Sequence, residues 1–171
     1  MSPGSIAQLS QSDAIAFRVR FKDKVPPQSK LYWRGPVMPS FDGRSWRVSQ
    51  SQGVYSVVPY AGLGTPVEYE VTLEPHGKNW LFALEMPADL PPESALTSDY
   101  QPVARQAVRN RLRYVQRAWP EAIAGVNEAP GTLRGALALP RDGKPRIRAI
   151  AAEWRAQHGG DGAAILAATE N

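Results

Sequence analysis

Residues 67–73 read VEYEVTL, so that Val, Tyr, Val and Leu alternate with Glu, Glu and Thr. Successive side chains of a β-strand point to opposite faces. The alternation therefore predicts a strand with one buried face and one wet face. Residues 13–21, DAIAFRVRF, repeat the pattern, with four apolar residues set against Arg18 and Arg20. The two segments indicate a protein built mainly of β-strands.

Shorter extended segments lie between and after these two strands. Leu31 to Trp33 begins a second run, which Gly35 and Pro36 bend or end. Asp42-Gly43 is a turn pair, and it predicts a tight hairpin that carries Trp46 on its return strand.

The next segments suggest further strands. A turn at residues 76–79 is followed by WLFAL at 80–84, a continuous apolar run typical of a strand covered on both faces. Residues 95–97 predict one more short strand.

Residues 103–119 allow two interpretations. A helical stripe passes through Val108, Leu112, Val115 and Trp119, but an alternating strand also fits the same segment. Beyond it the pattern is helical. Thr132 to Leu139 predicts a short helix, a second begins at Pro145 after the Asp142-Gly143 turn, and a third covers 161–171.

Strands therefore come first and helices last, which favours segregated layers over alternating βαβ units. The predicted fold class is α+β and mainly β: an antiparallel β-sandwich or partly open barrel followed by two or three C-terminal helices. We expect a β-rich accessory domain at 1–130 and a helical segment at 131–171. The last helix has no Gly or Pro terminator, and we expect the chain to be part of a longer protein.

The composition excludes several kinds of site. The chain has 171 residues, 43% of them hydrophobic, with no Cys and only His76 and His158. Thiolate nucleophiles, disulfides, iron–sulfur clusters and Cys-rich zinc sites are therefore absent. No dinucleotide, P-loop, zinc-protease or nucleophile-elbow motif occurs, and we predict no cofactor and no metal. No run reaches the roughly 18 apolar residues of a membrane-spanning helix.

The net charge of +4 is unevenly distributed. Five arginines lie within thirteen residues: Arg105, Arg109, Arg111, Arg113 and Arg117. Such a cluster suits phosphates, anionic lipid, an acidic partner surface or the solvated edge of a sheet. No nucleic-acid-binding motif accompanies it, and we expect no nucleic acid as partner.

Two other side-chain patterns each have a structural and a functional interpretation. Glu68 and Glu70 share one strand face, as a carboxylate pair or cation site requires, but the wet face of a sheet looks the same. The aromatic residues suit either core packing or a stacking platform for sugar or nucleic acid; they are Tyr32, Trp33, Phe41, Trp46, Tyr55, Tyr60 and Trp80. The platform would make the chain a free-standing binding module, which is the alternative function.

Four blocks in matching order resemble the bacterial TgpA-type transglutaminase-like membrane proteins. They are SQSDAIAFRVRF (10–21), LYWRGPVMPSFDGRSW (31–46), WLFALEMP (80–87) and LALPRDGKPRIRAIAAEW (137–154). The most specific element is LYWRG followed by FDGRSW.

The resemblance implies an extracytoplasmic, periplasmic β segment, placed between membrane helices outside this chain and a papain-like core with a Cys-His-Asp triad. It implies that residues 131–171 resemble the start of that core. Without Cys the chain is expected to be non-catalytic, a scaffold whose partner is the core of the same polypeptide. Arg34 and Asp42 are candidates for a charged pair that caps a turn or joins an interdomain contact; a local salt bridge that fixes the loop is the alternative. Arg109, Arg111 and Arg113 are candidates for a partner surface.

Overall fold

The computed structural model describes residues 13–48, 54–55, 57–140, 145–159 and 161–169. The chain divides into two compact units, Met1–Leu137 and Ala138–Asn171. The first unit holds all the strands, a short 3₁₀ helix η1 (Gln28–Lys30) and helix α2 (Pro130–Ala136). The second holds helices α3 (Pro145–His158) and α4 (Gly162–Thr169). The order of elements is mainly β and then helical, as the sequence predicts, and all strand pairs are antiparallel.

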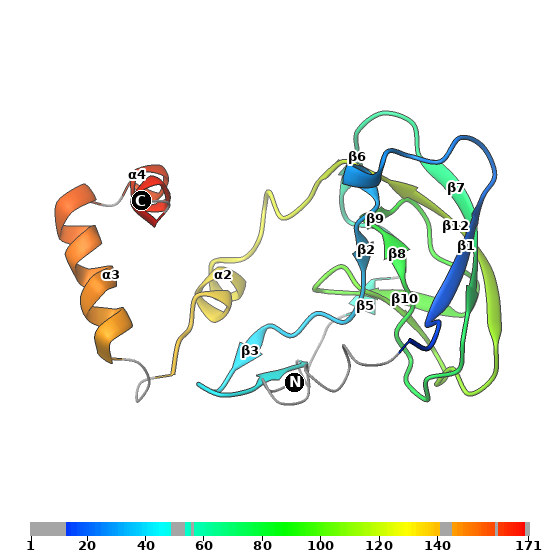
Figure 1. Cartoon of the computed structure of the whole chain (residues 1–171), viewed down its shortest axis with the longest axis horizontal. Coiled ribbons are helices and arrows are strands. Elements are labelled where there is room, and N and C mark those ends of the chain that lie inside the picture. Colours follow the sequence, from blue (N-terminus) through cyan, green and yellow to red (C-terminus); the bar gives the residue numbers. More distant parts are fainter. Residues whose placement is uncertain (1–12, 49–53, 56, 141–144, 160, 170–171) are drawn as a thin grey trace. The chain divides into compact units, whose positions relative to one another are not determined.

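Four strands form the principal sheet in the order β1-β7-β12-β9 (Figure 1). Their bounds are Phe17–Phe21 for β1, Val67–Leu73 for β7, Leu112–Trp119 for β12 and Met86–Pro87 for β9. A second sheet has the order β11-β10-β5, with β11 at Pro102–Ala104, β10 at Ser94–Thr97 and β5 at Val54–Tyr55. These two sheets account for most of the β structure.

Three two-stranded pairs complete the β structure of the described residues: β13-β6, β2-β8 and β3-β4. Their bounds are Ala122–Ile123 (β13), Ala61–Gly62 (β6), Trp33–Arg34 (β2), Ala83–Leu84 (β8), Ser40–Phe41 (β3) and Trp46–Arg47 (β4). The predicted hairpin around Asp42-Gly43 is confirmed, because Phe41 pairs with Trp46 across it.

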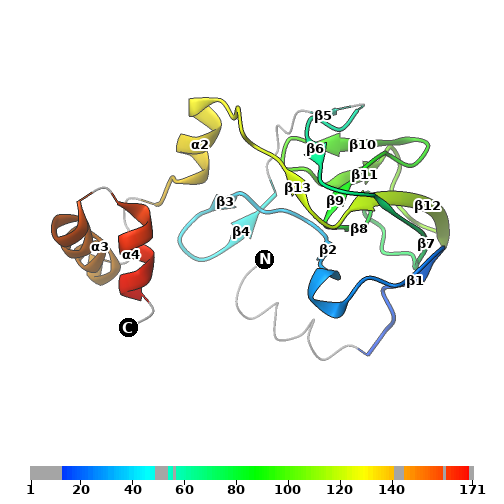
Figure 2. The same cartoon turned by 90° about the horizontal axis from the view of Figure 1, so that it is seen from above.

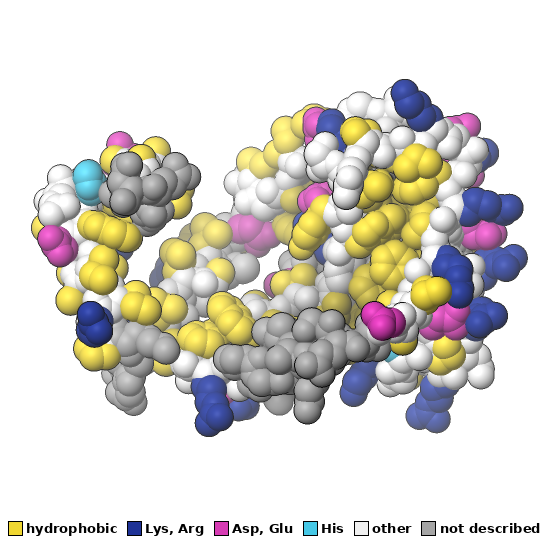
Figure 3. Space-filling view, in the orientation of Figure 1, with side chains coloured by type: hydrophobic (Ala, Val, Ile, Leu, Met, Phe, Trp, Pro, Cys, Tyr) yellow, Lys and Arg dark blue, Asp and Glu magenta, His cyan; other side chains and the backbone are white. Residues whose placement is uncertain are grey.

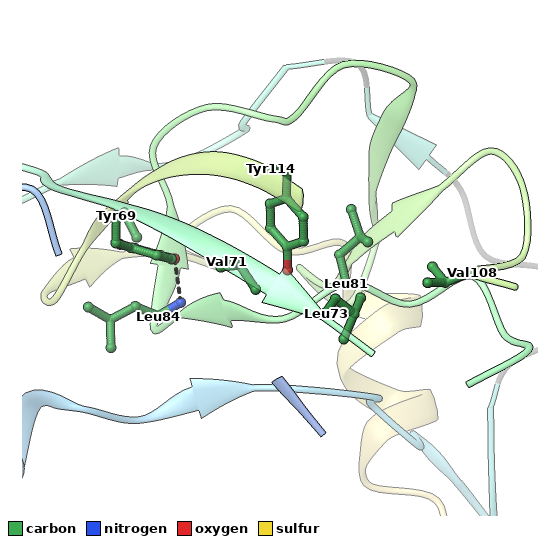
Figure 4. Packing of buried hydrophobic residues seen from close by; sticks show 8 residues of the cluster. Tyr69, Val71, Leu73, Leu81, Leu84, Val108 and Tyr114 are labelled. Carbon is green, nitrogen blue, oxygen red and sulfur yellow. Dashed lines mark hydrogen bonds between the residues drawn. The ribbon is translucent and has the colours of Figure 1, made fainter. Parts of the chain in front are cut away.

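The core lies against the inner faces of β7 and β12. Tyr69, Val71 and Leu73 alternate with the outward residues of β7 and are fully buried, as predicted. Figure 4 shows them packed with Leu84, Val108 and other side chains of the same cluster. Fully burying a side chain of this size contributes roughly 1.5–3 kcal/mol, so this alternation is a main source of the fold's stability.

The structure resolves the ambiguity at 103–119 in favour of strands. Residues 112–119 form β12, the longest strand, and its alternating burial matches the strand pattern rather than the helical stripe. Val108 is buried in the preceding loop, where its backbone bonds to that of residues 76–78. Pairing with β7 decides the conformation, because the neighbouring strand provides partners for the backbone N–H and C=O groups of residues 112–119. The apolar period of the segment fits a helix and a strand equally and cannot decide between them.

Other predicted elements are confirmed with different limits. Within WLFAL only Ala83–Leu84 is a strand, and Trp80 makes an isolated bridge to Val103. Ile15 lies outside β1 and is exposed. Helix α2 covers 130–136 instead of 132–139, because Pro130 at its first turn supplies the start that Thr132 was expected to give. The Asp142-Gly143 turn lies outside the described residues.

The helical unit is defined by its ends. Pro145 opens α3, and Gly159, with φ of 63°, ends it in the left-handed conformation that favours glycine. Oδ1 of Asp161 accepts the backbone N–H groups of Ala163 and Ala164, a cap for α4. Helices α3 and α4 contact each other. The two compact units meet between Leu137 and Ala138, so α2 lies in the first unit. The expected domain boundary at 130/131 stays a prediction.

Candidate interaction surfaces

Arg113 and Arg117 of the arginine cluster lie on the outward face of β12 in the principal sheet, and Arg111 directly precedes that strand. Arg18 on β1 and Arg111 before β12 both bind Glu74, at 2.8 and 3.1 Å. Hydrogen bonds from Arg111 and Arg18 hold the pKa of Glu74 below its usual value. One carboxylate thus serves two guanidinium groups from flanking strands.

The same arrangement continues along the sheet. Glu70 lies 3.6 Å from Arg20 and 3.8 Å from Arg113. The remaining pairs are Lys22 with Glu68 at 2.8 Å and Arg117 with Asp89 at 2.6 Å. We call these residues the charge ladder: Arg18, Arg20, Lys22, Glu68, Glu70, Glu74, Asp89, Arg111, Arg113 and Arg117. Figure 3 shows side chains of both signs interspersed along this edge.

The charge ladder changes the interpretation of both sequence motifs on this face. Glu68 and Glu70 are bound to Lys and Arg side chains, which is the wet-face arrangement rather than a vacant carboxylate pair. Arg111 and Arg113 form ion pairs with Glu74 and Glu70, respectively. Arg109 makes no ion pair with any described residue. The basic cluster is therefore largely neutralised by its neighbours.

Arg34 and Asp42 do not pair with each other. Nε of Arg34 donates to the carbonyl oxygen of Glu85 at 2.9 Å, and Nη2 donates to Oε1 of Glu85 at 3.2 Å. The guanidinium also lies 5.9 Å from the centre of the Tyr32 ring. Glu85 has φ of 42°, a left-handed conformation that is unfavourable for a residue with a side chain. The two hydrogen bonds from Arg34 help to hold Glu85 in this conformation. The predicted charged pair is wrong because β2 pairs with β8 and so brings Glu85 to Arg34.

Asp42 organises the hairpin between β3 and β4. Its Oδ1 accepts the backbone N–H groups of Arg44 and Ser45, at 3.0 and 2.7 Å. Its Oδ2 lies 2.8 Å from Nη2 of Arg47. The two backbone hydrogen bonds, followed by the Arg47 charge, hold the pKa of Asp42 below its usual value. Asp42 is a turn-fixing residue, which is one of the two roles predicted for it.

The aromatic side chains belong to separate clusters. Trp33 packs in the core edge-on to Phe17 and Tyr69. Phe41 and Trp46 stack on the hairpin at 4.6 Å, Tyr60 packs with Tyr100 and Trp119, and Trp80 stacks on His76. A stacking platform needs several rings on one exposed face. The described residues do not form one, and the core-packing interpretation accounts for Trp33.

The side chains that could act as a catalytic group or a metal ligand are those of His, Asp, Glu and Cys. In the part of the chain that the structure describes, no three His, Asp or Glu side chains are grouped to hold a metal ion. His76 lies in a surface turn and His158 at the end of α3, in different compact units. The sequence contains no Cys. Among the described helices, none is long and apolar enough to cross a membrane.

The sequence analysis singled out Glu68 and Glu70 but missed Glu74 and Glu85, two further acidic partners on these surfaces. Glu74 continues the outward alternation of β7 beyond Thr72, so its position on the ladder was visible in the pattern. Glu85 had no such signal. It is 51 residues from Arg34 and follows a buried run without periodicity.

Comparisons with known proteins agree with this architecture. The profile of the TgpA N-terminal domain family matches residues 1–123. The chain belongs to the TgpA N-terminal domain family. The TgpA-type resemblance noted from the four sequence blocks is thereby confirmed.

Two relatives of the TgpA family come from Pseudomonas aeruginosa. A protein-glutamine gamma-glutamyltransferase of strain PAO1 is 38% identical over 158 residues, which are 92% of this chain and 24% of that protein. The crystal structure of the TgpA periplasmic domain bound to ethylmercury is 37% identical with a TM-score of 0.87, and the match covers 99% of this chain and 59% of that one. A second crystal structure of that domain matches with the same TM-score over 98% and 58%.

The chain thus spans about a quarter of the curated relative and about three fifths of the solved TgpA domain. The match to a solved periplasmic domain confirms the extracytoplasmic location expected for this family. It also confirms the mainly β fold with C-terminal helices.

Proposed function

We propose that this chain is the non-catalytic N-terminal segment of a periplasmic transglutaminase-like protein and a scaffold for its Cys-His-Asp core. Acyl transfer of this type proceeds through a thiolate nucleophile, and the chain has no Cys. The curated relative is a protein-glutamine gamma-glutamyltransferase that this chain matches over 24% of its length. Chemistry on a glutamine side chain therefore requires groups that lie outside these 171 residues.

The observation that carries the proposal is the exposure of the apolar side chains that the structure describes in the helical unit. None of the α3 residues is buried, and Ile147 and Ile150 are 59% and 44% exposed. Helix α4 reads GAAILAAT, apolar on nearly every side, and Leu166 is 68% exposed. A helix that is hydrophobic all round is stable when it is buried, and a unit shorter than about 40 residues rarely folds by itself.

The helical unit therefore fits the role of the first part of a larger fold. We propose that the transglutaminase-like core covers α3 and α4. The β-rich unit, with its own buried cluster, would supply a rigid base. Arg34 and Asp42 stabilise the β2 and hairpin region of that base. Among the described ion pairs, those of the arginine cluster involve Arg105, Arg111, Arg113 and Arg117, which leaves the charge of Arg109 for a partner.

The test compares this 171-residue chain with a longer version produced from the same gene. We expect acyl transfer from a glutamine peptide to an acceptor amine, measured as the ammonia that leaves when the thioester forms, with the longer protein alone. We also expect amide hydrogen exchange in α3 and α4 to be fast in the 171-residue chain and slow in the longer protein. Turnover by the 171-residue chain, or equal protection of both helices in the two proteins, would overturn the proposal.

A further inference from the structure

The β3–β4 hairpin, residues 40–47, is the feature that the scaffold role leaves unexplained. Figure 1 and Figure 2 place it apart from the sheet of β1, β7 and β12. Its strands pair with each other and with no other described strand. A two-stranded hairpin is marginally stable by itself in water, so a hairpin in this position needs either strong local support or a partner.

Local support is present and holds the hairpin in one shape. Asp42 binds two backbone N–H groups of the turn and the Arg47 guanidinium. Phe41 and Trp46 stack face to face across the strands, with ring planes 28° apart. A preorganised loop loses little conformational entropy when it binds, which favours tight association.

The exposed side chains of the hairpin are those that anchor protein interfaces. Trp46 is 48% exposed, and Val48, next to β4, is 46% exposed. Arg44 is exposed at the turn and makes no ion pair with a described residue, and Arg47 is 70% exposed beyond its single contact with Asp42. Trp and Arg are enriched among the residues that contribute most binding energy.

From these contacts we infer that the hairpin is a docking arm, whose Trp46 enters an apolar pocket rimmed by carboxylates on the transglutaminase-like core. The inference rests on the proposed function, because it takes the core as the partner. The solved TgpA domain supports this occupant: two fifths of that chain lie outside its match to ours, enough protein to carry such a pocket. The positive charge of Arg44 and Arg47 calls for an acidic rim.

The experiment introduces Trp46→Ala and Arg44→Glu separately into the longer protein and into the 171-residue chain. Val25→Ala is the matched control, because Val25 is 55% exposed in the loop after β1. In the longer protein we expect residues 40–47 to exchange their amide hydrogens about tenfold more slowly than in the 171-residue chain. Trp46→Ala and Arg44→Glu should remove this protection and lower the thermal midpoint of the longer protein, while Val25→Ala should change neither.

The outcomes separate this inference from the proposed function. If α3 and α4 are protected in the longer protein but residues 40–47 exchange equally in both proteins, the core does cover the helices and the docking arm is wrong. A dimer by light scattering that Trp46→Ala dissociates would assign the hairpin to a second copy and also overturn the inference. Arg44→Glu leaves the Phe41–Trp46 stack and the Asp42 contacts in place, so its effect reports docking even if Trp46→Ala unfolds the hairpin.

Discussion

The backbone N–H of Leu84 donates a 2.7 Å hydrogen bond to the hydroxyl oxygen of Tyr69, and both residues are buried (Figure 4). Tyr114 also binds the backbone of this segment. Its hydroxyl accepts a hydrogen bond from the N–H of Phe82 at 3.1 Å and donates one to the carbonyl oxygen of Phe82 at 2.8 Å. Two tyrosines of the principal sheet thus form hydrogen bonds with backbone groups of residues 82–84, of which only Ala83–Leu84 form a strand. Burial raises the pKa of both hydroxyls, which keeps them neutral.

Replacing Tyr69 by Phe is expected to lower the free energy of unfolding by about 1–3 kcal/mol, because the Leu84 N–H is then buried without a partner. Urea unfolding of the 171-residue chain measures this loss. Tyr32→Phe is the control, since the Tyr32 ring is 59% exposed and its change should leave stability unaltered. Equal midpoints for Tyr69→Phe and Tyr32→Phe would contradict the role given to the buried hydroxyl.

Gly62 is expected to tolerate no side chain. A Cβ built there would lie 1.8 Å from Cδ2 of the Trp119 ring, which packs over β6. Gly62→Ala should therefore displace Trp119 and cost about 1–3 kcal/mol, the usual range for overpacking. Gly131→Ala in α2, where no atom lies within 4 Å of the new Cβ, should cause no such loss. Near-ultraviolet circular dichroism reports the Trp119 environment, and an unchanged spectrum for Gly62→Ala would refute the close contact.

Arg34→Lys is expected to be destabilising although it keeps the charge. Lysine cannot form the fork that binds both the carbonyl and the carboxylate of Glu85. Loss of one of these partly buried bonds should lower stability by about 1–3 kcal/mol. Arg105→Lys, in an ion pair that is 74% and 78% exposed, is the control and should leave the thermal midpoint unchanged. Equal behaviour of the two variants would show that charge alone matters at residue 34.

His76 predicts a loss of stability in mild acid. Burial lowers the pKa of His76 below its model-peptide value of 6.5, and its Nδ1 accepts the backbone N–H of Lys78 at 3.2 Å. Because the folded pKa is the lower one, the unfolded chain binds the proton first as pH falls below 6.5. The free energy of unfolding should therefore decrease from 6.5 downward until the folded pKa is passed.

Urea unfolding at several pH values between 7.5 and 5 measures that slope. His76→Gln removes the titrating group and should therefore reduce the change of the free energy of unfolding with pH. His158→Gln in α3 is the control and should leave the pH dependence of the β-rich unit unchanged. A slope that both variants share with the parent chain would show that His76 has the same pKa in the two states.

The charge ladder predicts weak affinity for nucleic acid. Glu68, Glu70 and Glu74 compete with phosphates for the Lys and Arg side chains beside them. Fluorescence anisotropy with a labelled single-stranded oligonucleotide should detect no binding at physiological salt. Replacing the three glutamates by Gln should create binding that weakens steeply with added salt, because phosphate contacts release counterions. Tight binding by the parent chain would contradict this prediction.

Much of the β architecture could be predicted from local patterns. The alternation at 67–73 matches the burial of Tyr69, Val71 and Leu73, although Val67 is only half-buried, and the Asp42-Gly43 pair predicted the hairpin that forms there. These features depend on side-chain period and turn chemistry, which are properties of neighbouring residues. The limits of α2 and β8 were less well predicted, because element ends depend on capping and on which strand lies opposite.

The candidate surface was only partly visible in the sequence. Asp42 was identified together with its turn-fixing role, but its expected partner Arg34 binds Glu85 instead. The sequence shows Arg111 and Arg113 within an arginine cluster, yet their partners Glu74 and Glu70 lie on or next to β7, some forty residues earlier. Ion pairs of this kind depend on strand pairing, which a linear pattern does not specify.

The amino-acid sequence by itself determined the absence of a cysteine nucleophile, the order of strands before helices and the inward residues of β7, because each depends on residue type and local period. Tertiary structure alone decided that residues 112–119 are a strand, that Arg34 binds Glu85 and that Glu70 and Glu74 each contact two arginines. Each of these required two segments distant in sequence to meet. Backbone hydrogen bonds and charges are satisfied by whichever groups the fold brings within reach.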